Sequence, residues 1–146
     1  MRIEVQAAAA TCLWFAISAT PAAAASCTVA AQGVNFGNYD VFALSHLESV
    51  GNIRVQCDAA TSVEVSLSPG LGDFTARRMS AGADELVYNL YTSSSRTTVW
   101  GDGTGGTATV STDALTADLT LYGTVPARQN ARPGLYTDTV VVTITY

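Results

Sequence analysis

The last thirteen residues, 134–146, alternate between two faces and are rich in β-branched and aromatic side chains. Successive side chains of a strand point to opposite faces, so this pattern predicts one long, half-buried β-strand. The sequence ends inside this strand, and we therefore expect a sheet that lacks the strand that would follow. The large apolar side chains on its inward face are Tyr136, Val140, Val142, Ile144 and Tyr146.

The same period of two recurs along the chain after residue 25, without any long helical pattern. Turn signals rich in Gly and Pro separate the apolar runs. About six strands joined in this way predict an all-β fold, an antiparallel sandwich of the immunoglobulin-like kind. Residues 76–83 and 93–112 are expected to form long loops or short extra hairpins. The predicted strands before the last one are residues 28–36 (with a break near Gly33), 52–57, 62–68, 86–91 and 119–125.

Residues 1–25 have the pattern of a secretory signal peptide. A positive Arg2 precedes an apolar run that ends near Ala19, Pro21 interrupts the run, and three alanines at 23–25 provide the small residues that a signal peptidase needs. The apolar run is shorter than the roughly 20 residues of a membrane-spanning helix. We expect cleavage after Ala25, which leaves one domain of residues 26–146. Lipidation is the alternative, although the large aliphatic residue of a lipobox is absent.

Two of the three cysteines, Cys27 and Cys57, lie beyond this leader. An even pair of cysteines in an exported protein predicts a disulfide, with two buried free thiols as the alternative. Cys57 shares the inward face of its strand, so the bridge would tie the first strand to the second near the core. Closing a loop of about 30 residues makes such a bridge worth about 3–4 kcal/mol in the chain-entropy model.

The predicted mature domain is acidic. Six arginines, no lysine and eleven carboxylates give it a net charge of −5 with His46 neutral. A negative chain repels phosphate backbones, so we expect no nucleic-acid partner. The adjacent Arg77 and Arg78 are interpreted as part of a solvated loop.

No motif of the chain predicts catalysis or cofactor binding. Residues 101–106 formally match G-x-G-x-x-G, but the sequence after them favours a strand or a loop over the helix that a dinucleotide site requires. We interpret them as a surface turn whose base is packed by Trp100. One histidine and two cysteines do not make a zinc site. A triad that uses His46 and Asp40 has no G-x-S-x-G elbow to support it. We expect no enzyme and no cofactor.

The chain resembles the spore coat protein U domain family, which includes subunits of archaic chaperone–usher pili. The resemblance covers nearly the whole predicted mature domain, and it depends on the order of several short segments. These segments are C-T-V at 27–29, V-N-F-G-N-Y-D at 34–40, G-N-I-R-V-Q-C at 51–57, L-S-P-G at 67–70, R-M at 78–79, L-V-Y-N-L-Y at 86–91, W-G-D-G-T at 100–104, Y-G-T-V-P-A-R-Q at 122–129 and the terminal run 134–146.

The resemblance implies a sandwich without its final strand. In such pilins a periplasmic chaperone first fills the hydrophobic groove, and a donor strand from a neighbouring subunit then replaces it after delivery to an outer-membrane usher. This is β-augmentation, in which main-chain hydrogen bonds supply affinity and alternate side chains set the register. If no strand is missing, the same residues are simply core. The groove residues implied here are Val34 and Phe36 from the first strand and Val140, Val142 and Ile144 from the last.

Polymerising members of the family carry an apolar donor segment before the first cysteine. After the predicted cleavage only Ser26 precedes Cys27. We therefore expect an exported structural or adhesive pilus subunit that accepts a strand and donates none, at the tip or another terminal position. Tip adhesins of such pili, however, usually have two domains. The alternatives are a secreted spore-coat or surface-matrix protein and a stand-alone binding module with a complete sandwich.

Overall fold

The computed structural model of the protein describes residues 25–113 and 115–146, and all regular elements in these ranges are β-strands. Residues 1–24, which hold nearly all of the predicted signal peptide, lie outside the described residues. Within the described ranges no helix is long and apolar enough to cross a membrane. The strands are β1 (Cys27–Gln32), β2 (Leu47–Cys57), β3 (Ser62–Leu67), β4 (Leu71–Gly72), β5 (Arg77–Ala81), β6 (Asp84–Tyr91), β7 (Val110–Asp113), β8 (Thr116–Val125) and β9 (Val142–Thr145).

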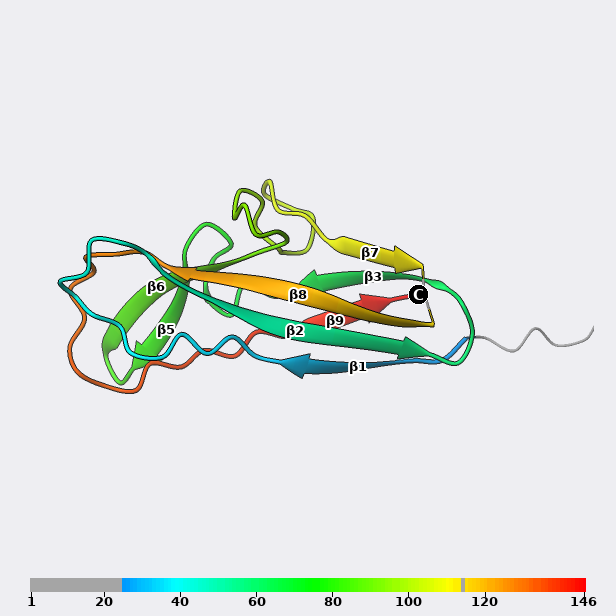
Figure 1. The fold of residues 1–146 in the computed structure, drawn as a ribbon, viewed down its shortest axis with the longest axis horizontal. Coiled ribbons are helices and arrows are strands. Elements are labelled where there is room, and N and C mark those ends of the chain that lie inside the picture. The colour runs from blue at the N-terminus through cyan, green and yellow to red at the C-terminus, as the bar shows by residue number, and fades with distance from the viewer. Residues whose placement is uncertain (1–24, 114) are drawn as a thin grey trace, which may run out of the picture.

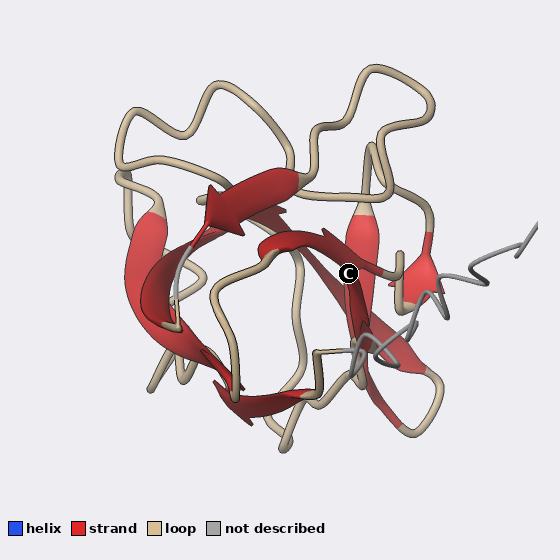
Figure 2. Ribbon diagram, turned by 90° about the vertical axis from the view of Figure 1, so that its right-hand side faces the viewer, coloured by secondary structure: helices blue, strands red, loops and turns tan. Residues whose placement is uncertain are grey.

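The strands form two antiparallel sheets that face each other across the core. The larger sheet has the order β1-β2-β8-β6-β5-β4, and the smaller has the order β7-β3-β9. The long strands β2 and β8 run along the molecule and pair from Leu47–Val125 to Gln56–Thr116 (Figure 1). Viewed along this axis, the strands curl around the interior (Figure 2). The predicted all-β, immunoglobulin-like sandwich is confirmed.

The core comes from the inward positions of the period-two pattern. From Gly51 onward in β2 and throughout β3 every second residue is buried, which includes Ile53, Val55, Val63, Val65 and Leu67. Burying each such side chain contributes about 1.5–3 kcal/mol. A shift of one residue would expose all of these side chains, so their burial sets the register of the two strands.

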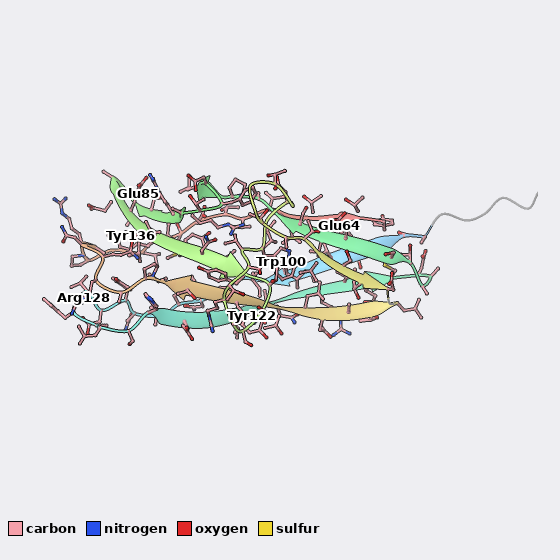
Figure 3. All side chains as sticks on the ribbon, turned by 90° about the horizontal axis from the view of Figure 1, so that it is seen from above. Glu64, Glu85, Trp100, Tyr122, Arg128 and Tyr136 are labelled. Atoms are coloured by element: carbon pink, nitrogen blue, oxygen red, sulfur yellow. A yellow bond between two sulfur atoms is a disulfide. The ribbon has the colours of Figure 1, made fainter. Side chains whose placement is uncertain are left out.

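Trp100 packs in the middle of the core, as expected for the base of its loop (Figure 3). It is 1% exposed, and its indole Nε1 donates a hydrogen bond to the Val65 carbonyl at 3.0 Å. The loop 101–106 that follows leads to β7 and opens no helix, so the structure agrees with a turn and not with a dinucleotide site.

A disulfide joins β1 to β2. Cys27 lies directly opposite Cys57 in the antiparallel register, and their sulfur atoms are 2.03 Å apart. Of the two cysteines, Cys57 is buried, so the bridge fastens the edge strand β1 to the core.

Replacing Cys27 and Cys57 together by serine is expected to lower the free energy of unfolding by about 2–4 kcal/mol, because the closed loop restricts the unfolded chain. Urea unfolding of the exported protein with and without reductant measures this. Intact mass after alkylation gives the control, and it also tests the predicted N-terminus near Ser26. Two thiols that alkylate without reductant, or a diacylglycerol mass on Cys27, would contradict the account.

The terminal segment differs in extent from the single long strand expected over residues 134–146. From Tyr136 to Ile144 its alternation is as predicted, with half-buried even positions and exposed odd ones such as Val141. Tyr146, which was expected on the inward face, is exposed. Only Val142–Thr145 forms a strand, paired with β3, while Thr137 bridges Ser80 of β5. The segment therefore passes from the larger sheet to the smaller one, and this change of partner interrupts a continuous ladder.

The prediction of a solvated loop at Arg77 is wrong. Arg77 begins β5 and is fully buried, whereas its neighbour Arg78 is exposed and pairs with Glu85 at 3.0 Å. The Arg77 guanidinium donates to Asn89 Oδ1 at 2.7 Å and to two main-chain carbonyls, and it lies 5.4 Å from the Phe74 ring. Burial lowers the pKa of Arg77, but a guanidinium stays charged in proteins. The carbonyl partners are Ser68 at 3.0 Å and Trp100 at 2.7 Å.

Candidate functional site: a cleft between two sheet edges

Two edge strands border the most open part of the sandwich. Within the described residues, β1 pairs only with β2, and β9 pairs only with β3. Each therefore has backbone N–H and C=O groups along one side that no neighbouring strand engages, a state that invites another strand. The arrows of β1 and β9 point in opposite directions (Figure 1). A strand inserted between them would run parallel to one and antiparallel to the other.

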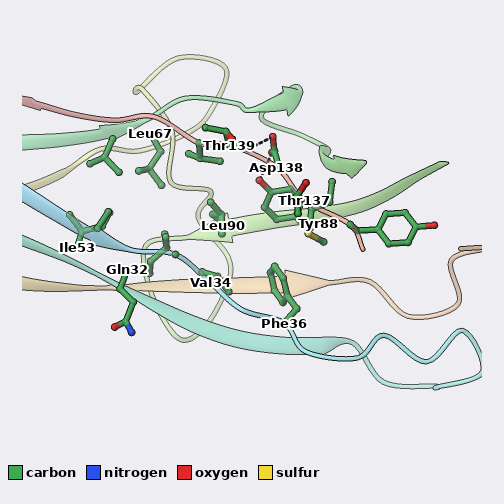
Figure 4. A pocket seen from close by; sticks show the side chains of 17 residues that line it. Gln32, Val34, Phe36, Ile53, Leu67, Tyr88, Leu90, Thr137, Asp138 and Thr139 are labelled. Carbon is green, nitrogen blue, oxygen red and sulfur yellow. Dashed lines mark hydrogen bonds between the residues drawn. The ribbon is translucent and has the colours of Figure 1, made fainter. Parts of the chain in front are cut away.

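A cleft of about 430 Å³ lies between these two edges. One wall consists of residues 31–34 with Phe36, and the other consists of residues 136–140 with Val142 (Figure 4). Core side chains form the floor, and they are Ile53, Leu67, Met79, Tyr88, Leu90 and Leu121. The surroundings are mainly hydrocarbon from five strands, so the cleft suits apolar side chains presented by an extended chain.

The residues predicted for a strand-accepting groove lie on these walls with one exception. Val34 and Phe36 line one wall and Val140 and Val142 line the other. Ile144 is on the same inward face as Val142 but lies beyond the cleft, opposite Val65 of β3. All five are partly buried against the core. That they bind a strand stays a prediction.

Two glycines bring Val34 and Phe36 into the sandwich. A Cβ on Gly123 of β8 would stand 2.7 Å from the Phe36 ring and 2.9 Å from Val34, and a Cβ on Gly51 of β2 would stand 2.6 Å from the Gln32 carbonyl. The chain after β1 therefore lies close against the inner face of the larger sheet. Glycine inside a strand often marks such an approach, and this signal was in the sequence.

The sequence reasoning also missed a polar group in this wall. Asp138 lines the cleft and accepts hydrogen bonds from the Tyr88 hydroxyl at 2.5 Å and the Leu71 amide at 3.0 Å. Burial, together with the hydrogen bond to this carboxylate, raises the pKa of Tyr88. Phe36 stacks edge-on against Tyr88 with 6.0 Å between the ring centroids. The side chains Phe36, Tyr88 and Asp138 thus connect the two walls across the floor.

The two residues of the triad considered from the sequence, His46 and Asp40, each accept a hydrogen bond from a loop amide. His46 Nδ1 accepts a hydrogen bond from the Ala127 amide at 3.1 Å, and Asp40 Oδ1 accepts one from the Phe42 amide at 2.9 Å. Among residues 25–113 and 115–146 no three His, Cys, Asp or Glu side chains gather in a way that could hold a metal ion. The cleft is therefore the feature of the described chain that best fits a function.

Comparisons with known proteins match most of this chain. The family model described as Spore Coat Protein U domain matches residues 13–143. The chain is 35% identical over 127 residues to Protein U of Myxococcus xanthus, an alignment that covers 77% of this chain and 71% of that protein.

A solved structure is also similar. It is a chain of the CsuC–CsuE chaperone–tip adhesion subunit pre-assembly complex from the archaic chaperone–usher Csu pili of Acinetobacter baumannii, with a TM-score of 0.58 and 26% identity. The match covers 84% of this chain but only 40% of the other, so this chain spans about two fifths of the length of that relative.

Proposed function

The chain belongs to the Spore Coat Protein U domain family, and from this membership we propose that it is a structural subunit of a chaperone–usher surface pilus. In this proposal the subunit is assembled by donor-strand complementation and occupies a terminal or tip position. The family and the solved relative support a structural, adhesive role and not an enzymatic one.

The observation that carries the proposal is the cleft between β1 and the terminal segment. Both of its edges present free backbone groups, and half-buried apolar side chains such as Val34, Phe36, Val140 and Val142 line its walls. Ten residues of strand, such as those opposite positions 136–145, would span about 33 Å. A strand of that length would satisfy both edges with main-chain hydrogen bonds and would place every second side chain in the cleft.

The proposed partners follow from this need for a strand. A periplasmic chaperone would cover the cleft first, an outer-membrane usher would receive the complex, and a donor strand of a neighbouring subunit would then replace the chaperone. The similar solved complex pairs a chaperone with a tip adhesion subunit, which supports both a chaperone partner and a terminal position. The route requires export through the periplasm to the cell surface, for which we propose residues 1–25 as the signal and residues 26–146 as the pilin domain.

A secreted spore-coat or surface-matrix protein is the second candidate. The description of the matching family and the 35% identity to Protein U favour it. In both candidates we propose that the same cleft accepts a strand of a neighbouring subunit by β-augmentation. They differ in whether an usher is required.

Co-expression with a candidate chaperone, with and without an usher, tests the proposal. We expect a stable one-to-one complex with the chaperone, because an uncovered apolar cleft favours aggregation. With the usher but no other subunit we expect no fibres by electron microscopy, since a terminal subunit joins one neighbour only. The absence of a chaperone complex would contradict the pilus proposal. Fibres made by this subunit alone would contradict the terminal position.

A further inference from the structure

One charged side chain interrupts the apolar inward face of the terminal segment. Tyr136, Val140 and Val142 present hydrocarbon to the cleft, whereas Asp138, in the middle of the same register, presents a carboxylate (Figure 4). We propose that Asp138 selects the strand that fills the cleft. The incoming strand carries a lysine or an arginine at the inward position that meets Asp138, with apolar side chains at its other inward positions. This inference rests on the proposed strand-accepting function.

The Asp138 carboxylate is held in a fixed orientation. Oδ2 accepts from the Tyr88 hydroxyl at 2.5 Å, and Oδ1 accepts from the amides of Leu71 at 3.0 Å and Thr139 at 2.7 Å. These contacts come from β6, from β4 and from the terminal segment itself. A carboxylate can accept about four hydrogen bonds, so one acceptor position remains. It belongs to Oδ2, on the side of the carboxylate that Gly70 of the 68–71 turn does not cover. The three donors are neutral, and they orient the negative charge without cancelling it.

No ion pair in the described part of the chain involves Asp138. The ion pairs found there join Arg54, Arg78, Arg96 and Arg132 to other carboxylates. The buried Arg77 interacts favourably with Asp138 through space, but its N–H groups bond to Asn89 and to main-chain carbonyls. In the uncovered cleft, water can solvate the half-buried Asp138 carboxylate.

A strand that covers the cleft removes this water. An apolar side chain over Asp138 would leave a desolvated charge with neutral partners only, which is costly. A basic side chain would complete the fourth acceptor position with a charge-assisted hydrogen bond, and an acidic one would be repelled. Against Leu67 or Leu121 a basic side chain would find no acceptor. The cleft therefore discriminates by position as well as by polarity, using attraction at one site and exclusion at the others.

A peptide scan tests this inference on the exported protein released from its chaperone. The parent is a twelve-residue peptide that alternates valine with threonine, and each derivative replaces one inward valine by lysine. Isothermal titration measures binding to the wild type and to Asp138→Asn, which keeps the shape of the side chain but removes its charge. Asp118→Asn, on the exposed outer face of β8, is the matched control. Melting of each protein with the parent peptide bound shows that it is folded.

We expect lysine to weaken binding by about tenfold or more at every inward position except one. At that position lysine binds at least as tightly as valine, and the exception disappears in Asp138→Asn but persists in Asp118→Asn. If the parent binds and lysine weakens binding equally at all positions, the inference is wrong while the proposed function stands. It is also wrong if the exceptional position survives in Asp138→Asn. If the parent peptide does not bind, the proposed function fails and the inference fails with it.

Discussion

Val142→Asp will abolish capture of this subunit by a periplasmic chaperone. Val142 lies on the wall of the cleft, opposite Leu67 of β3, and its side chain is half-buried against the core. A chaperone strand that covers the cleft would bury the new carboxylate among hydrocarbon without a partner, which costs several kcal/mol. Loss of the valine side chain also removes up to about 1.5–3 kcal/mol of burial. Co-purification of chaperone and subunit from the periplasm measures the effect.

The adjacent residue provides the control. Thr143 has the same backbone environment in β9, but its side chain is exposed on the opposite face. Thr143→Asp should therefore retain the chaperone complex. Val142→Ala should weaken capture without abolishing it, which separates loss of burial from introduction of charge. If Thr143→Asp and Val142→Asp lose capture equally, the substitutions disrupt β9 as a whole, and the role assigned to its inward face is wrong.

Arg77→Met will lower the free energy of unfolding by about 2–4 kcal/mol. The guanidinium is fully buried and satisfies Asn89 Oδ1 together with the carbonyls of Ser68 and Trp100. Methionine fills part of the space but leaves the Ser68 and Trp100 carbonyls without this donor, whereas Asn89 Oδ1 keeps the Leu90 amide at 2.9 Å. Unpaired buried acceptors are costly. Because single domains are stable by only about 5–15 kcal/mol, the variant should be recovered at much lower yield.

Arg78 is the natural control for this experiment. It follows Arg77 in β5, points outward and pairs with Glu85 on the surface. Surface ion pairs contribute about 0–1 kcal/mol, so Arg78→Met should leave stability nearly unchanged. Urea unfolding of the disulfide-intact proteins compares the two. A change below about 1 kcal/mol for Arg77→Met would mean that the buried network stabilises the fold far less than its geometry indicates.

The sequence predicted the parts of the fold that follow simple alternation. Strands β2, β3, β6 and β8 were all expected, because their inward positions are Val, Ile, Leu or Tyr at a spacing of two. Strand β3 ends one residue earlier than expected, whereas the extents of β2, β6 and β8 were underestimated where polar residues or glycine interrupt the pattern. The first part of β2, which includes Gly51, is an example, since its pairing with β8 makes it a strand regardless of local composition.

The missed features depend on contacts between distant segments. Residues 76–83 were expected to form a loop or a short hairpin, and β5 pairs with β6 as a hairpin. The adjacent arginines were interpreted as solvated, and only the tertiary arrangement of carbonyl groups allows Arg77 to be buried. Asp138 escaped notice for the same reason, since its donors come from Tyr88 and Leu71, far away in the sequence. The family resemblance and the alternation together predicted that Val34, Phe36, Val140 and Val142 face a groove. They did not predict how far each side chain is buried or which core residues form the floor of the cleft.

We propose above all that the cleft between β1 and β9 binds a strand from another chain. Hydrogen–deuterium exchange of the exported protein, before and after addition of the valine–threonine peptide, tests it most directly. The account predicts new protection of backbone amides in both Cys27–Gln32 and Val142–Thr145, because an inserted strand bonds to both edges at once. The amides of the opposite edge strand, β7, should exchange as before. Protection confined to β7, or no new protection in either β1 or β9 when the peptide is bound, would contradict the account.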